Sequence, residues 1–208
     1  MKQDHYRNLA RPYDWIYEPS ERIMRRIGLQ VFPPGDNLSI LDVGCGTGTQ
    51  LALYRRAGSN LYGVDTSPAM LAIARRKLGE NADLRLEDAC HMTFADHMFD
   101  LVTVVFVLHE MPAAIRPAVL TECRRVLGSD GRVMLIDYDF GPYTFPISII
   151  WRALRTMMEI SAGRQHYANY REFRTHGGLE PLITEVKFSV DRKVSSKHGI
   201  ATVYLLKL

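Results

Sequence analysis

The sequence feature that most constrains the fold is the stretch Leu-Asp-Val-Gly-Cys-Gly-Thr-Gly at positions 41–48. An apolar run, Ser39–Val43, leads into it and an amphipathic run follows, so the stretch predicts a strand, a tight turn and a helix. Glycines at Gly44, Gly46 and Gly48 allow the chain to turn sharply and let a ligand approach the backbone without meeting a Cβ. The turn therefore predicts a ligand-binding crossover in an open α/β sheet.

Short apolar runs and amphipathic runs alternate along the rest of the chain, which is typical of a parallel sheet with crossover helices. The expected strands are Ser39–Val43, Leu61–Asp65, Leu84–Leu86, Phe99–Leu108, Gly131–Tyr138, Ile183–Val190 and Ala201–Lys207. The expected helices are about Ser20–Gly28, Gln50–Ala57, Ser67–Leu78, Pro112–Leu127 and Tyr170–Gly177. A turn-rich segment, Asp191–Gly199, separates the last two strands and is compatible with a closing antiparallel hairpin.

Length, charge and cysteine usage exclude several classes of protein. The 208 residues suit one well-buried domain, and a net charge of +3 is too mild to predict a nucleic-acid partner. Three cysteines, Cys45, Cys90 and Cys123, lack the spacing of a disulfide framework or a zinc site, so we expect a reducing cytoplasm and no metal site. No window reaches the ~20 apolar residues of a membrane-spanning helix.

Acidic residues beside the strand ends indicate the kind of ligand. Asp42 directly precedes the glycine turn, where its carboxylate would repel a pyrophosphate but suit an amino group or a sulfonium, so NAD is disfavoured. Asp65 ends the second strand about 20 residues after Gly44, the separation typical of an acid that binds ribose hydroxyls. The alternative is a cap of the following helix, which Thr66 or Ser67 could also provide, so the ribose role is favoured. Asp88 follows the third strand and suits an adenine amino group or, alternatively, a solvated loop.

Together these motifs resemble the class I S-adenosylmethionine-dependent methyltransferases. LDVGCGTG matches the glycine motif of that family, and GVDTSPAML at 63–71 matches its acidic strand end. EDA at 87–89 matches the adenine-contact position. The stretches 99–111 and 124–139 resemble the fourth strand and the unit that leads into the fifth. Near the start, YRNLARPYDWIYE looks like the capping segment of the ubiquinone/menaquinone-type enzymes.

The resemblance implies a Rossmann-like, doubly wound α/β fold whose seven-stranded sheet is mostly parallel with an antiparallel last strand. It implies one domain over 1–208, with N-terminal cap helices in 1–30 and a substrate lid inserted at 139–180. S-adenosylmethionine is the implied cofactor. In the family the position of Phe106 often carries a polar residue, so no polar cofactor contact is expected from it in this chain. The implied cofactor-binding residues are Tyr13, Asp42, Gly44, Cys45, Gly46, Gly48, Asp65, Thr66, Met70, Asp88, Ala89 and Phe106.

His109 is the candidate catalytic base. It follows the expected fourth strand, at the sheet edge where ligands of open α/β folds gather, and an ordinary imidazole titrates near neutral pH. We expect Glu110 to orient it. The alternative is a histidine bonded only to backbone. Asp137, Tyr138 and Asp139 end the fifth strand on the same rim and are expected to meet polar groups of the substrate.

The stretch Asp139–Met158 is expected to form a lid over an apolar acceptor, because it follows the fifth strand at the rim where the cofactor is expected. From Ile147 its apolar residues recur at steps of three and four, so part of this face is expected to pack on the sheet as a crossover helix. Its arginines are expected to meet an anionic headgroup or a membrane surface. The acceptor is therefore expected to be small and apolar or lipid-like, such as a quinone precursor or a lipid headgroup. The residues expected to line it are Phe140, Tyr143, Phe145, Trp151, Met157 and Met158.

Two other functions stay open at this point. One is a methyltransferase for a polar metabolite or a protein, and the other is a binding module that senses S-adenosylmethionine without transferring its methyl group. The oligomeric state is not indicated by the sequence.

Overall fold

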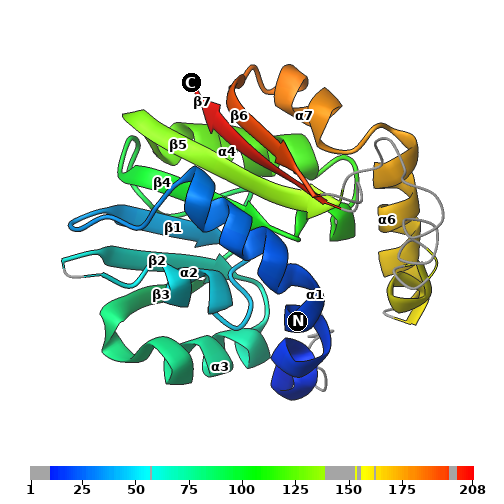
Figure 1. Cartoon of the computed structure of the whole chain (residues 1–208), viewed down its shortest axis with the longest axis horizontal. Coiled ribbons are helices and arrows are strands. Elements are labelled where there is room, and N and C mark those ends of the chain that lie inside the picture. Colours follow the sequence, from blue (N-terminus) through cyan, green and yellow to red (C-terminus); the bar gives the residue numbers. More distant parts are fainter. Residues whose placement is uncertain (1–9, 57, 139–152, 154–155, 162, 197–200) are drawn as a thin grey trace.

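A computed structural model describes residues 10–208 apart from 57, 139–152, 154–155, 162 and 197–200 (Figure 1). The strands are β1 Ser39–Val43, β2 Asn60–Asp65, β3 Ala82–Leu86, β4 Phe99–Val105, β5 Leu127–Tyr138, β6 Ser189–Ser195 and β7 Ala201–Lys207. The helices are α1 Ala10–Val31, α2 Thr49–Leu53, α3 Pro68–Leu78, α4 Arg116–Val126, α6 Arg164–Thr175 and α7 Leu179–Glu185, with 3-10 turns η1 Gly79–Asn81 and η2 Leu108–Glu110.

The strands form one seven-stranded sheet in the order β3-β2-β1-β4-β5-β7-β6. Strands β1 to β5 run parallel to one another, and β7 is antiparallel to both β5 and β6. The expected fold class and the closing antiparallel hairpin are therefore confirmed.

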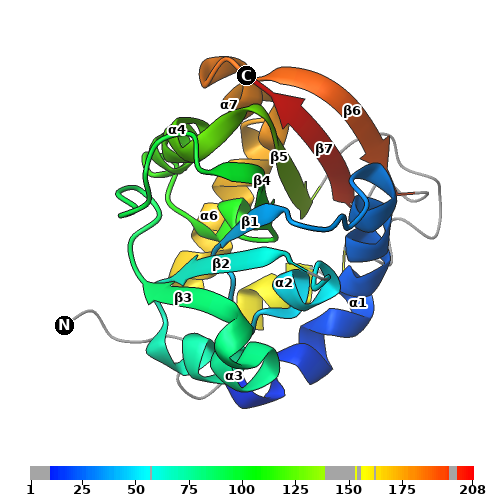
Figure 2. The ribbon, with the colours of Figure 1, turned by 90° about the vertical axis from the view of Figure 1, so that its left-hand side faces the viewer.

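Helices cover both faces of the sheet, with α1, α2 and α3 on one side and α4 and α7 on the other (Figure 2). Successive side chains of a strand point to opposite faces, and the central strands are apolar on both. In β1, Leu41 and Val43 pack in the α4 layer, whereas Ile40 packs in the α1 layer. Helix α6 lies beyond the carboxyl ends of the strands, which places it over one edge of the sheet (Figure 1).

The expected strand Ile183–Val190 is wrong over most of its length. Residues Leu179–Glu185 form α7, because Leu179 and Ile183 are four residues apart and both pack in the α4 layer. The strand β6 begins only at Ser189 and includes residues 191–195, which we expected to be a turn. It lies at the sheet edge with mostly exposed side chains, so a polar sequence suits it.

The fourth strand ends at Val105, earlier than the expected Leu108. Phe106 has a φ of 57° and Leu108–Glu110 forms η2, so the chain leaves the sheet at Phe106. A left-handed backbone at a bulky residue is rare and marks a locally constrained turn. This turn directs the residues after β4 over the edge of the sheet.

The expected lid lies largely outside the described residues. These omit 139–152 and 154–155, and with them Asp139, Phe140, Tyr143, Phe145, Trp151 and both arginines of the stretch. The described part of the expected lid region consists mainly of a helical segment at 156–161 and of helix α6. Within the parts of the chain that the structure describes, no helix has the length and apolar character needed to cross a bilayer.

Candidate active site

The glycine turn joins β1 to α2 in a left-handed path. Gly44, Gly46 and Gly48 have φ values of 70°, 49° and 75°, which glycine adopts at little cost. The Gly46 amide donates to Oδ2 of Asp65 at 2.8 Å, and the Ser67 amide donates to Oδ1 of the same carboxylate at 2.8 Å. Asp65 thus braces the turn and the start of α3 together. Ser67 is the N-cap of α3, and its side chain accepts from the Met70 amide at 3.2 Å.

A cavity of about 430 Å³ lies beside this turn at the carboxyl ends of the strands. Every residue that the sequence assigned to the cofactor lines it, except Gly48. Gly48 instead faces α3, since a Cβ at that position would lie 2.9 Å from Leu78 Cδ1. A Cβ on Gly46 would meet no protein atom within 4 Å.

Asp42 is buried at this cavity and accepts a hydrogen bond from Thr103 Oγ1 at 2.6 Å. Burial raises the pKa of its carboxyl to about 7, although the Thr103 bond and the nearby Arg25 act in the opposite direction. The cavity therefore contains an acid that a cationic ligand would help to ionise.

Arg25 is a cavity residue that the sequence analysis missed. Its buried guanidinium donates from Nη1 to Gln50 Oε1 at 3.1 Å and from Nη2 to Glu21 Oε2 at 2.8 Å. One sequence pattern could have indicated it. Glu21 and Arg25 are four residues apart, a spacing that allows an ion pair on one helix face, and the apolar Met24 lies on the same buried face of α1. Arg25 Nε also lies 3.2 Å from Glu18 Oε2, so two carboxylates hold this positive group in place at the cavity.

Asp14 attaches the start of α1 to the glycine turn. Its carboxylate accepts from Lys77 Nζ at 2.6 Å and from Thr47 Oγ1 at 2.5 Å, and Lys77 Nζ also donates to Thr49 Oγ1 at 2.6 Å. Burial raises the pKa of Asp14, but the bonds from Lys77 and the threonines outweigh it and leave the pKa below its usual value. The expected capping segment therefore contacts the turn through Asp14.

Replacing Lys77 with methionine should lower the free energy of unfolding by less than about 1 kcal/mol, because both partners of the ion pair are partly exposed. Asp14 has a lowered folded pKa, so its contribution is present at neutral pH and is lost as the pH falls through that pKa. Urea unfolding of Lys77→Met, Asp14→Asn and the double variant measures the coupling. Strictly additive losses would contradict the pairing.

A second cavity, of about 440 Å³, adjoins the first and shares Tyr13, Phe106, Glu110 and Pro112 with it. Aromatic side chains from α1 and β5 line one part of it. Its other part is polar and is formed by η2, the segment 156–161 and α6. The residues that distinguish it from the first cavity are Tyr17, Glu21, His109, Tyr138, Met158, Glu159, Gly163, Arg164, Gln165, His166 and Asn169.

His109 lies at the polar end of this second cavity, on the predicted rim of the sheet. Its buried imidazole places Nδ1 2.8 Å from Asp137 Oδ1, whereas Nε2 lies 3.9 Å from both Glu110 Oε1 and Glu159 Oε2. The expectation that Glu110 orients the ring is wrong, because Asp137 at the end of β5 makes the direct bond. Sequence spacing could not show that β4 and β5 bring these two residues together.

The charge of His109 also differs from the expectation. Burial alone would lower the pKa of the imidazole, but the carboxylates of Asp137, Glu159 and Glu110 raise it to about 9. The ring therefore does not titrate near neutral pH in the described structure. The surrounding carboxylates thus favour the protonated ring, which is not the form in which an imidazole acts as a general base.

Phe106 is one of the residues that line both cavities. Its ring centroid lies 5.2 Å from that of Tyr138, and the Tyr138 ring lies 4.5 Å from the His109 ring. The left-handed backbone at Phe106 thus places an apolar side chain in contact with both cavities. Met158 lines the second cavity, as expected of a lid residue, but Met157 is 67% exposed.

Known proteins match both the sequence and this arrangement. The profile of a family described as a methyltransferase domain matches residues 41–135. The phosphatidylethanolamine N-methyltransferase of Cereibacter sphaeroides is 33% identical over 148 residues, covering 68% of this chain and 70% of that one. The chain belongs to the class I S-adenosylmethionine-dependent methyltransferases.

Two further comparisons place this methyltransferase within the family. The demethylmenaquinone methyltransferase of Lactobacillus johnsonii is 37% identical over 105 residues, 47% of this chain and 42% of that one, so the alignment spans less than half of that relative. The expected resemblance to the ubiquinone/menaquinone type is thereby confirmed. A methyltransferase structure from Aquifex aeolicus shares the fold, with a TM-score of 0.61 and 17% identity over 88% of each chain.

The first cavity fits S-adenosylmethionine by the chemistry of its lining. The open space at Gly46 leaves room against the backbone, Asp42 suits the sulfonium or the amino group, and Arg25 suits the carboxylate. Asp65 and Asp88 suit the ribose and adenine. Asp65 also makes the bracing bonds described above, and Asp88 accepts from the Cys90 amide at 3.0 Å, so the alternative readings of these acids apply as well.

We expect the affinity for S-adenosylmethionine to rise by up to about tenfold between roughly pH 6 and pH 8. Burial raises the pKa of Asp42 to about 7, and only the ionised carboxylate attracts the cationic cofactor, so affinity increases as the pH passes that value. Calorimetric titration measures it. Asp42→Asn is the control for titration of the cofactor's own amino group, and an equal pH dependence in that variant would contradict the assignment.

Proposed function

We propose that the chain transfers a methyl group to the polar end of a small lipid-like acceptor that enters the second cavity. The observation that carries the proposal is a cavity with aromatic walls and a polar end, adjoining the cavity that fits the cofactor. The relatives' names support it, because demethylmenaquinone and phosphatidylethanolamine both join an apolar tail to a polar reacting end.

In this proposal the two parts of the second cavity have different tasks. Tyr13, Phe106 and Tyr138 contact the apolar part of the acceptor and exclude water. His109 is the proposed catalytic residue and contacts the reacting end. The cofactor supplies an activated methyl group, so the protein needs mainly to hold the nucleophile in line and keep the site dry.

Release of S-adenosylhomocysteine tests the proposal when acceptors are compared in pairs that differ only in the tail. One pair is a reduced demethylnaphthoquinone with and without its isoprenoid tail, and the other is phosphatidylethanolamine and phosphoethanolamine. We expect the tailed member of one pair to react at least about tenfold faster, since apolar burial contributes roughly 0.8 kcal/mol for each CH₂. Equal or faster reaction of the tail-less members would favour a polar metabolite. Cofactor binding without transfer to any member would favour the sensing module.

A further inference from the structure

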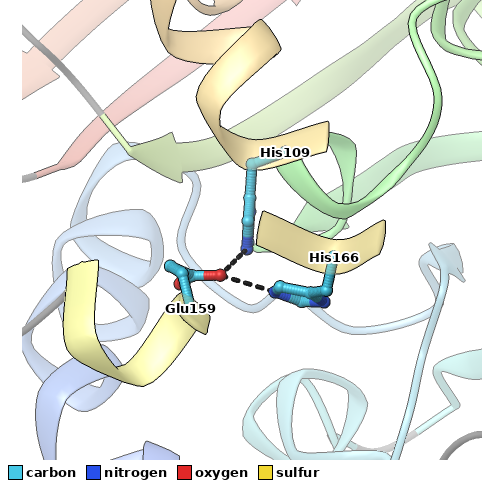
Figure 3. Close-up of side chains that lie close together, drawn as sticks. All are labelled: His109, Glu159 and His166. Atoms are coloured by element: carbon cyan, nitrogen blue, oxygen red, sulfur yellow. Dashed lines mark hydrogen bonds and ion pairs between the residues drawn. The ribbon is translucent and has the colours of Figure 1, made fainter. Parts of the chain in front are cut away.

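The polar end of the second cavity contains a cluster of the metal-ligand type. One ligand atom each from His109, Glu159 and His166 lies within 4.8 Å of the other two. Nε2 of His166 is 2.5 Å from Glu159 Oε2, and Nε2 of His109 is 3.9 Å from the same oxygen. Figure 3 shows the three side chains pointing toward one another from separate elements. Two imidazoles and one carboxylate form a common set of three protein ligands for a divalent ion that keeps an open position.

Asp137 prepares His109 for such a role. Its carboxylate accepts from the Nδ1 side of the ring at 2.8 Å, which leaves Nε2 as the atom that faces Glu159. A carboxylate on the far nitrogen of a ligating histidine fixes the ring and its tautomer in many metal sites. His109 therefore has the outer partner that a ligand requires.

Glu110 supplies a further oxygen close to the cluster. Its Oε1 lies 3.9 Å from His109 Nε2 and 4.0 Å from His166 Nε2. Two carboxylates and two imidazoles thus gather in a part of the protein where their side chains are between 3% and 24% exposed. A divalent ion would replace the protonated His109 as the positive charge between these carboxylates, and the His109 ring would lose its proton on binding it.

The elements that carry the ligands are fixed relative to one another. Asn169 of α6 donates from Nδ2 to the Glu110 carbonyl at 2.6 Å. The buried Arg116 donates from Nη2 to the Asn169 carbonyl and from Nε to the Leu108 carbonyl, both at 2.9 Å, and also bonds Glu172. These bonds hold η2 against α6, so His109 and His166 are kept on facing sides of one space.

We propose that His109, Glu159 and His166 bind one divalent transition-metal ion, with its open side toward the acceptor cavity. Imidazole nitrogens favour Zn²⁺ over Mg²⁺, which prefers oxygen ligands. The expectation of no metal site considered only the cysteines, and His109 lies 50 residues before Glu159 in the sequence. Binding of the ion does not depend on the proposed function. A role in holding an oxygen of the acceptor does rest on it, and His109 would then act on the acceptor through the ion, because its Nε2 cannot bind both.

Zinc titration of the full chain, stripped of metal and without cofactor or acceptor, tests the site. We expect one equivalent of Zn²⁺ to bind much more tightly than Mg²⁺. His166→Ala should weaken Zn²⁺ binding by at least about 100-fold, because even loss of an outer partner of a ligand costs 10- to 100-fold. His176→Ala is the matched control. His176 is exposed and does not line the cavity, and its Nδ1 lies 2.9 Å from Glu172 Oε1, so this variant should bind Zn²⁺ like the wild type.

Absence of stoichiometric Zn²⁺ binding, or equal binding by the wild type and His166→Ala, would overturn the site. Thermal melts verify that the variants are folded. We expect His166→Ala to fold, because the His166 side chain is partly exposed. Because the titration contains neither cofactor nor acceptor, its failure is distinct from a failure of methyl transfer. If Zn²⁺ binds but its removal by a chelator leaves turnover unchanged, the role in holding the acceptor is excluded.

Discussion

Replacing His109 with alanine should lower turnover by at least about 100-fold, which is within the range for loss of a catalytic side chain that acts on the reacting group. The affinity for S-adenosylmethionine should stay nearly unchanged, because His109 lines the second cavity and not the one that fits the cofactor. Turnover with the best acceptor and calorimetric cofactor binding measure the two effects separately.

The fold should survive this substitution. Asp137 keeps two backbone donors, the amides of residue 109 at 3.2 Å and of Tyr138 at 2.7 Å, so its buried carboxylate is not left without hydrogen bonds. His176→Ala is again the matched control. Unaltered turnover in His109→Ala would remove this residue from the mechanism, and an equal loss of cofactor affinity would point to damage of the whole site.

Replacing Gly46 with alanine should weaken cofactor binding by about 10- to 100-fold, the equivalent of 1–3 kcal/mol of steric overlap. The new Cβ meets no protein atom within 4 Å, so any contact it makes is with a molecule in the cavity. The left-handed φ of 49° also costs some stability. Calorimetry of binding and urea unfolding separate the two contributions.

Gly79 provides a close control for this substitution. It has a φ of 66°, and its Cβ would likewise meet nothing within 4 Å, but it ends α3 and does not line the cavity. Its ψ of −149° makes the conformation one that nearly only glycine adopts, so Gly79→Ala should lose stability of its own but no cofactor affinity. If both variants bind the cofactor like the wild type, the glycine turn does not contact it as proposed.

The sequence predicted the sheet well because its central strands are buried on both faces. Such strands are apolar throughout, and the bounds of β1 and β7 agree with the expectation to the residue. The same criterion failed for α7, whose short apolar stretch has the composition of a strand but packs with helical spacing. It also failed for β6, since an exposed edge strand needs no apolar residues.

The cofactor site was predictable because its residues lie in one turn and at the ends of neighbouring strands. The acceptor end was not, because it forms only in three dimensions. His109, Asp137 and His166 come from η2, β5 and α6, and no short spacing links them. Arg25 was missed for a similar reason, as it reaches the cavity from a helix that runs across the sheet.

Mass-spectrometric analysis of the acceptor after reaction with methyl-deuterated S-adenosylmethionine tests the central claim most directly. The account predicts that a tailed acceptor gains one labelled methyl group for each S-adenosylhomocysteine released, and that His109→Ala abolishes both products together. Labelling confined to tail-less, water-soluble acceptors, or a lipid-like product formed equally well by His109→Ala, would contradict it.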